Sequence, residues 1–269
     1  MPIKFKKTVS KGSRFNQIYV PKNMENLVEV GDKVEVRLIK KHANLYYSKG
    51  LKGLSEFKEN LTKDIFSFLN KIPGIGSILV VGSFLTEKIN YNDIDLILIT
   101  NKVNNKFEET AYTKLIEKFN LKFHVLAVEE KRFWHLLKIC PLTKAMLTNF
   151  ISNKPIKIPN KTSIDEKHIK FLLMMPYDLL DIKLSSRTFF DNLRRLITIE
   201  RFLRNKNLNI VTINEELREI IKDRLYKKIR HNEEIEENSI KFLRKMIKTK
   251  LEIIEALIKK WEKIKICRS

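Results

Sequence analysis

The sequence holds few of the residues that mark several protein classes. Only two cysteines, seven glycines and seven prolines occur among its 269 residues. Two cysteines exclude a disulfide-stabilised scaffold, and so little glycine and proline excludes a collagen-like or linker-dominated chain. No apolar run approaches the roughly 18 residues of a membrane-spanning helix, and the first residues carry no secretory signal pattern. We therefore expect a cytoplasmic protein without a membrane partner.

Positive charge dominates what is present. The chain carries 53 lysines and arginines against 32 acidic residues, a formal net charge of +21. The excess is spread over all three stretches into which the sequence texture divides, 1–45, 46–164 and 165–269. Two explanations fit a dispersed excess: a polyanionic partner such as DNA, RNA or a nucleotide, or the lysine-rich surface of a thermophile-like protein. The 43% apolar content excludes a disordered chain.

The hydrophobic pattern changes twice along the chain and predicts three domains, 1–45, 46–160 and 161–269. The first alternates apolar and polar residues at period two, which is typical of β structure. The second alternates helical spacing with short continuous apolar runs, which indicates an α/β sandwich. Its predicted helices span 51–70 and 104–119, and its predicted strands span 77–83, 93–100 and 121–128. The third domain is helical throughout, with its clearest helices over 189–203 and 240–261.

The segment from Val80 to Thr100 carries the pattern most indicative of chemistry. Gly82-Ser83 ends one apolar strand, and Asp93-Ile94-Asp95 opens the next. Carboxylates at positions i and i+2 of a strand project from the same face, and paired carboxylates suit Mg²⁺, which commonly bridges them to substrate phosphates. A glycine lets phosphate approach the backbone, where free N–H groups and a serine hydroxyl can bind it.

Each half of this pattern also has an ordinary explanation. A Gly-Ser after a strand is often a simple turn, and a lone acid-x-acid occurs on many surface strands. An acidic pair within a strand that is otherwise isoleucine and leucine is costly without compensation, which favours the functional interpretation.

Residues 50–130 resemble the DNA polymerase β-type nucleotidyltransferase superfamily, because they combine an apolar strand, Gly-Ser, a short connection and acid-apolar-acid on the next strand. The resemblance implies that Gly82 and Ser83 bind a nucleoside triphosphate (NTP). It also implies that Asp93 and Asp95 are catalytic residues that hold Mg²⁺ or Mn²⁺. Members of this superfamily transfer a nucleoside monophosphate to a hydroxyl of nucleic acid, protein or a small molecule.

One departure concerns the third carboxylate that active members usually carry on a later strand. The predicted strand 121–128 contains no acid, and His124 takes the corresponding place as a candidate catalytic residue. Imidazole can accept a proton but is a poor ligand for Mg²⁺. His124 therefore either serves catalysis or marks an impaired domain. Glu129 and Glu130 after the strand are possible replacements, although they also suit the start of a helix.

Residues 3–41 resemble the AbrB/SpoVT swapped-hairpin family. The features that carry the likeness are a basic first strand, Val20-Pro21-Lys22, a short predicted helix, and Gly31-Asp32-Lys33-Val34 followed by a strand. The resemblance implies an intertwined homodimer that often binds DNA; the alternative is a dimerisation hairpin with a solvated basic face. The candidate contacts to phosphate are Lys6, Lys7, Lys11 and Arg14.

The helical domain offers a weaker pattern. Arg187, Arg194 and Arg201 recur at intervals of seven residues and so share one helical face. They can neutralise a triphosphate or a nucleic-acid backbone, or they can form a solvated face.

The sequence as a whole predicts a Mg²⁺-dependent nucleotidyltransferase. Its α/β core would follow an N-terminal dimerising hairpin and precede a C-terminal all-α domain. The alternative is a dimeric nucleic-acid-binding regulator, in which a nucleotidyltransferase-like domain senses nucleotide or serves as a scaffold.

Overall fold

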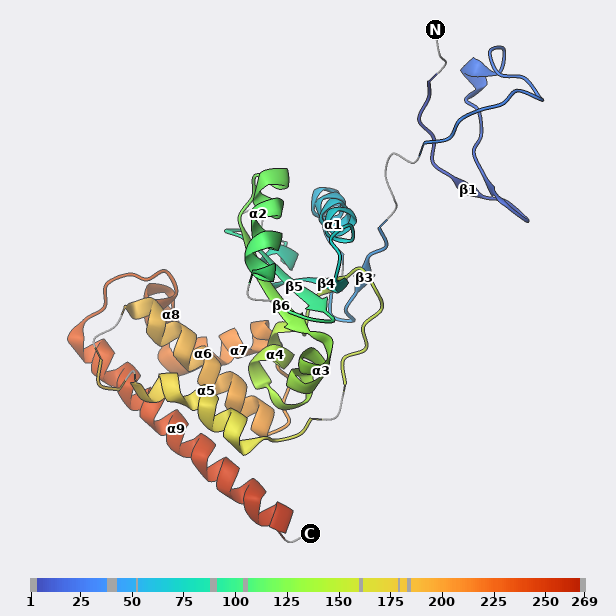
Figure 1. Ribbon diagram of the computed structural model, residues 1–269. Helices are drawn as coiled ribbons and strands as arrows, with labels where there is room; N and C mark the ends of the chain where they lie inside the picture. The colour runs from blue at the N-terminus through green and yellow to red at the C-terminus, as the bar shows by residue number, and fades with distance from the viewer. Residues whose placement is uncertain are drawn as a thin grey trace. The chain divides into compact units, whose positions relative to one another are not determined.

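The computed structural model describes residues 4–37, 43–51, 53–87, 91–103, 106–159, 162–178, 180–182 and 185–266 (Figure 1). The chain separates into two compact units at the step from residue 41 to residue 42. We call the described residues 4–37 the N-terminal unit and those from 43 onward the main unit. The predicted division of the main unit at 160/161 lies outside the described residues, and the three-domain organisation stays a prediction.

The N-terminal unit has little regular structure. β1 (Ser10–Lys11) pairs antiparallel with β2 (Asn16–Gln17), and a 3₁₀ turn, η1 (Lys22–Met24), stands where a short helix was predicted. Over residues 18–37 the structure contains none of the strands that the period-two pattern predicts. The physical reason is that the large apolar side chains of a single copy have nothing to pack against. These exposed side chains are Val9, Phe15, Ile18, Tyr19, Leu27, Val30, Val34 and Val36.

The main unit is built on a five-stranded mixed sheet ordered β3-β7-β4-β5-β6. Neighbouring strands pair antiparallel except β5 and β6, which are parallel and connected by α2 (Phe107–Phe119). The strands are β3 (Tyr46–Tyr47), β4 (Ile75–Val81), β5 (Ile94–Thr100), β6 (Phe123–Glu129) and β7 (Ile151–Ser152). The three long strands and α2 confirm the predicted elements. Sequence analysis missed β3 and β7, since two residues are too few to show a period.

Helices cover both faces of the sheet. α1 (Glu56–Leu69) and α2 pack on the face that carries Ile94, Leu96 and Leu98. α3 (Glu130–Ile139) packs on the opposite face, which carries Ile97 and Ile99. The long strands are therefore buried on both faces, as their continuous apolar runs predicted.

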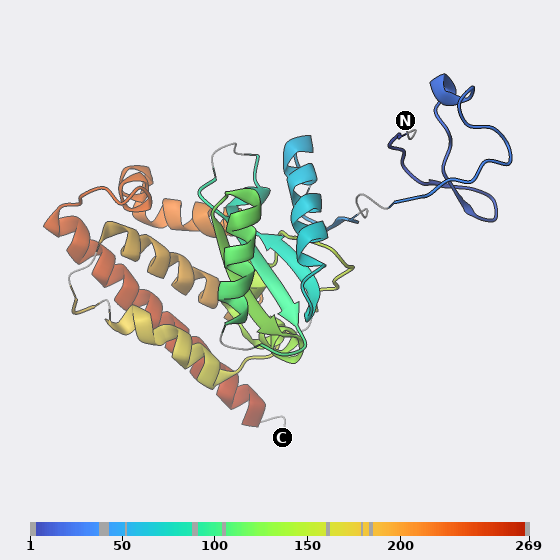
Figure 2. The same cartoon turned by 45° about the horizontal axis from the view of Figure 1, so that its top comes forward.

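The rest of the main unit is helical, as predicted (Figure 2). α6 lies at the centre of this region and contacts α4, α5, α7, α8 and α9. The helices are α4 (Pro141–Met146), α5 (Glu166–Asp178), α6 (Ser186–Leu203), α7 (Ile210–Ile221), α8 (Asp223–Arg230) and α9 (Glu237–Ile266). Among the described residues, no helix is both long enough and apolar enough to cross a membrane.

Candidate active site

The turn after β4 brings backbone and carboxylate together. β4 ends at Val81, which pairs with Asp95 at the start of β5. Gly82 follows with φ of +78°, and a Cβ built at this position would lie 2.0 Å from Oδ2 of Asp95. Any side chain here would both strain the backbone and displace the carboxylate. The glycine is thus the residue that lets Asp95 lie against the turn.

Ser83 lies in the short 3₁₀ segment η2 (Gly82–Leu85) and is exposed, whereas Phe84 and Leu85 are buried and anchor the segment. The Ser83 carbonyl accepts from the backbone N–H of Thr86 at 3.1 Å and from its hydroxyl at 2.8 Å. The turn therefore presents its glycine and serine to solvent from a fixed base.

Lys58 of α1 holds this turn through hydrogen bonds to its backbone. Sequence analysis did not identify Lys58 as a site residue. Its Nζ donates to the carbonyls of Phe84 at 2.9 Å and Thr86 at 2.7 Å. The same nitrogen lies 5.3 Å from the Phe84 ring centroid and 5.4 Å from that of Tyr91, two rings that meet edge to face. Burial lowers the pKa of the Lys58 ammonium. Lys58 is only 5% exposed.

A signal for Lys58 was present in the sequence. It stands one helical turn from Leu54 and from Leu61, and so on the apolar face of the predicted helix 51–70. A lysine on such a face must find acceptors, because burying an unpaired ammonium is costly.

The two predicted carboxylates lie at the start of β5. Asp93 immediately precedes the strand, and Asp95 is its second residue. Ile94 between them is buried among side chains of α1 and α2, so alternation turns Asp95 to the other face of the sheet. Burial and the like charge of Asp93 raise the pKa of Asp95, against the opposing hydrogen bond from His124.

His124 lies beside Asp95 on the neighbouring strand. The parallel register of β5 and β6 pairs these two residues directly. Nδ1 of His124 is 3.1 Å from Oδ1 of Asp95, and the His124 side chain is 75% exposed. An ionised carboxylate can only accept, so Nδ1–H donates to it and leaves Nε2 able to take a proton.

The glutamates at the end of β6 and the start of α3 do not replace the missing acid at this site. Glu129 pairs with Thr100 at the opposite end of the strand, and Glu130 begins α3. Glu129 lies five positions after His124 along the strand, roughly 16 Å at the usual rise per residue. Among the described residues, no group of three histidine, cysteine, aspartate or glutamate side chains lies close enough to hold a metal ion.

A shallow hollow of about 240 Å³ opens next to His124. Glu108 on its wall uses Oε1 to accept from the backbone N–H of Ala127 at 2.7 Å, and so occupies one of the free donors of edge strand β6. The lining residues are Glu108, Glu109, Tyr112, Phe123, His124 and Val125.

The predicted nucleic-acid contacts lie in the other unit. Lys6, Lys7, Lys11 and Arg14 belong to the N-terminal unit, where all four are exposed. Lys11 is part of β1, and Arg14 lies in the turn that joins β1 to β2. Their basic side chains are thus available to a partner of that unit.

Comparison with known proteins gives one kind of likeness. No protein-family model and no curated protein matches the sequence. The structure is similar to the crystal structure of spectinomycin adenyltransferase AAD(9) from Enterococcus faecialis with ATP and spectinomycin. The TM-score is 0.39 and the identity 13%, over 71% of this chain and 98% of that chain. A likeness at this level assigns neither activity nor substrate to the chain.

Proposed function

We propose that the protein is a nucleotidyltransferase that moves a nucleoside monophosphate from an NTP to a hydroxyl acceptor. The observation that carries the proposal is the contact between the Gly82 turn and the Asp95 carboxylate. A polyphosphate seated on the backbone of this turn lies next to the carboxylates. That is the arrangement nucleotidyl transfer needs, because catalysis of phosphoryl transfer consists mainly of positioning and charge neutralisation.

Asp93 and Asp95 supply a donor set that suits Mg²⁺ or Mn²⁺. Both are hard oxygen ligands, and Mg²⁺ is commonly bound by one or two carboxylates together with substrate phosphates. When bound, such an ion neutralises charge on the phosphates and polarises the reacting phosphoryl group. The raised pKa of Asp95 fits this assignment, since a bound cation would relieve the repulsion between the two carboxylates.

The chain's own groups provide the remaining roles. Gly82 and Ser83 bind and orient the triphosphate through backbone N–H groups and a hydroxyl. The acceptor oxygen attacks the α-phosphorus, and the bond to the bridging oxygen breaks to release pyrophosphate. Nε2 of His124 takes the acceptor's proton while Asp95 orients the ring.

Transfer of an α-labelled nucleotide to candidate acceptors tests this function in the presence of Mg²⁺ or Mn²⁺. We expect the double variant Asp93→Asn/Asp95→Asn to lose transfer. We expect His124→Gln to keep metal-dependent NTP binding while transfer falls roughly a hundredfold or more, the usual contribution of a general base. Label transfer that persists in the double variant would contradict the proposed site.

A second candidate function is a dimeric nucleic-acid-binding regulator with an impaired nucleotidyltransferase-like domain. The exposed His124 in place of a third carboxylate favours it. Retained NTP binding without transfer to any acceptor, in both wild type and the Asp93→Asn/Asp95→Asn variant, would support this alternative.

For the N-terminal unit we propose an AbrB/SpoVT-like role: pairing of two copies, and binding of DNA through Lys6, Lys7, Lys11 and Arg14. The exposed apolar side chains of a single copy support pairing, because a second copy can cover them. Deletion of residues 1–41 should halve the mass measured by light scattering, and an unchanged mass would contradict pairing. Substitution of the four basic residues by glutamine should weaken DNA binding and leave the mass unchanged.

A further inference from the structure

Four arginines of α6 and its C-cap, Arg187, Arg194, Arg201 and Arg204, divide into two groups by the carboxylates available to them. In the second half of the helix, Arg201 pairs with Glu216 at 2.6 Å, and Arg204 pairs with Glu200 at 2.9 Å. Each of these guanidinium groups has a carboxylate within hydrogen-bond distance. Arg201 therefore belongs to an internal ion-pair network. The interval of seven residues had predicted that it shares one helical face with Arg187 and Arg194.

In the first half of α6, the positive charge exceeds the negative charge of the carboxylates that pair with it. Arg187 and Arg194 share the single carboxylate of Asp191, at 3.1 Å and 3.5 Å. One oxygen of this carboxylate, Oδ1, is buried without a hydrogen-bond partner among the described residues. Two guanidinium groups thus share one carboxylate, and Oδ1 of that carboxylate accepts no hydrogen bond from them.

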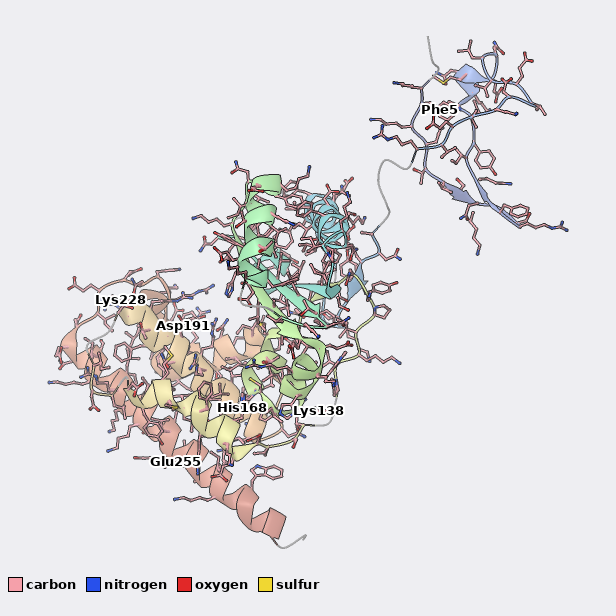
Figure 3. All side chains as sticks on the ribbon, in the orientation of Figure 1. Phe5, Lys138, His168, Asp191, Lys228 and Glu255 are labelled. Atoms are coloured by element: carbon pink, nitrogen blue, oxygen red, sulfur yellow. The ribbon has the colours of Figure 1, made fainter. Side chains whose placement is uncertain are left out.

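A third arginine, Arg230 at the end of α8, lies beside this group, and its charge acts on Arg194. The Arg187 Nη1 donates to the backbone carbonyl of Arg230 at 2.7 Å. The Arg230 guanidinium lies 5.9 Å from the Tyr226 ring centroid, and Tyr226 meets Phe190 edge to face. Figure 3 shows Asp191 on α6 and Lys228 on the adjoining α8 at this corner of the helical region. The structure records no ion pair between Arg230 and a described carboxylate.

Aromatic rings hold these guanidinium groups in place. Arg187 and Arg194 lie 4.9 Å and 5.4 Å from the centroid of the Phe190 ring. A stacked guanidinium keeps its N–H donors at its edges, where they can bind the oxygens of an anion in pairs. The backbone N–H of Arg187 also donates to Oδ1 of Asn232 at 3.0 Å, which ties the end of α8 to the start of α6.

The cluster carries an excess of positive charge. Arg187, Arg194 and Arg230 bring three positive charges against the one negative charge of Asp191. Burial lowers the pKa of the Arg194 guanidinium, and the like charges of Arg187 and Arg230 lower it further, while Asp191 raises it. A second anion between these groups would offset the repulsion.

We propose that Arg187, Arg194 and Arg230 form a binding site for a phosphoryl group, separate from the Asp93–Asp95 site. Phosphoryl is the class that fits best, because its several oxygens can accept paired N–H bonds from more than one guanidinium. The group can belong to a free polyphosphate or to the phosphodiester backbone of a nucleic acid. The chemistry is shared, and the two sources are separated by experiment.

The test measures binding and thermal unfolding of the full chain without metal. The probes are sodium tripolyphosphate and a labelled ten-nucleotide single-stranded RNA, in EDTA at constant ionic strength set with chloride. Wild type should bind at least one probe, and that probe should raise its Tm. Arg194→Gln should weaken binding about tenfold and remove the Tm rise. Arg224→Gln, an exposed arginine of α8 outside the cluster, should change binding less than about twofold, because it loses only diffuse charge.

Which of the two probes loses affinity identifies the compound that supplies the phosphoryl group. Loss of tripolyphosphate binding in Arg194→Gln identifies a free phosphate compound, and loss of RNA binding alone identifies a backbone. Equal weakening by Arg194→Gln and Arg224→Gln, or no binding by wild type, overturns the proposal.

Two more variants guard the conclusion. If Arg194→Gln does not fold, Arg194→Lys is the replacement variant. It keeps the charge but loses the paired N–H donors of the planar guanidinium, and it should bind the probe more weakly than wild type. Arg187→Gln should weaken probe binding as Arg194→Gln does, in a measurement that needs no nucleotidyl transfer, so that failure of the nucleotidyltransferase proposal leaves this one intact.

Discussion

The two units of the chain treat the same kinds of residue in opposite ways. The main unit buries isoleucine, leucine and valine in three clusters around its sheet and helices. The described part of the N-terminal unit buries none of its large apolar side chains and exposes most of them, with Val34 and Val36 each 64% exposed. The difference teaches that an apolar pattern predicts a face that needs a covering surface. The main unit supplies that surface within one copy, whereas a single copy of the N-terminal unit does not.

Isoleucine-to-alanine substitutions give the strongest test of that comparison. Ile78 is fully buried in β4, so Ile78→Ala should lower the free energy of unfolding by about 3 kcal/mol in urea denaturation. Ile18 in the N-terminal unit is 40% exposed, and Ile18→Ala should cost less than about 0.5 kcal/mol under conditions where the chain is monomeric. Similar costs at the two positions would refute the contrast.

Two glycines with positive φ extend the comparison to the backbone. Gly82 has φ of +78° and Asp95 beside it, whereas Gly31 in the N-terminal unit has φ of +108° and open space. Gly31→Ala should cost only the backbone strain, about 1 kcal/mol at most, and Gly82→Ala should cost clearly more, about 2–3 kcal/mol. Only Gly82→Ala should also weaken metal-dependent NTP binding, measured by titration calorimetry.

Lysine-to-methionine changes compare a buried cation with exposed ones. Lys58→Met would leave the carbonyls of Phe84 and Thr86 without their donor, so unfolding should require about 2 kcal/mol less free energy. Lys63→Met on the same helix breaks a partly exposed pair with Glu59, and Lys11→Met lies in the N-terminal unit; both should stay within about 0.5 kcal/mol.

NTP binding gives a second, functional measurement of Lys58, because this lysine holds the turn that carries Gly82 and Ser83. NTP affinity should fall in Lys58→Met and recover in part in Lys58→Arg, which keeps a donor. Full affinity in Lys58→Met would show that the turn holds its shape without this lysine.

The smallest expected effect is the pH dependence contributed by Asp95. Its pKa in the folded state is raised above the unfolded value, so the folded state holds the proton more tightly. Stability from this group is therefore present below the unfolded pKa and declines as pH rises through the folded pKa. Asp95→Asn should raise Tm at neutral pH, with a difference that shrinks as pH falls toward 4. Asp32→Asn in the exposed N-terminal unit is the control, and a constant difference across pH would contradict the linkage.

Much of the main unit follows from local pattern. The continuous apolar runs correctly predicted β4, β5 and β6, and helical spacing correctly predicted α1, α2, α6 and α9. Alternation along β5 also placed Asp95 opposite Ile94. The expected strands of the N-terminal unit failed because a period reports which face is apolar without reporting whether anything covers it.

The neighbours of the site residues were less predictable. Lys58 reaches the turn from 26 positions earlier, and His124 reaches Asp95 from 29 positions later. Such pairs depend on helix packing and strand register, which no local pattern encodes. The arginine cluster shows the same limit, since Arg201 shares the heptad spacing of Arg187 and Arg194 but pairs with α7 instead.

The sequence by itself determined the three long strands of the main unit and its helices α1, α2, α6 and α9, because backbone periodicity is a local property. Tertiary structure alone decided that Asp95 lies against Gly82, that His124 lies within hydrogen-bond distance of Asp95, and that Arg230 of α8 lies beside two arginines of α6. The reason is physical: each of these contacts joins segments that meet only after the sheet has its register and the helices have packed.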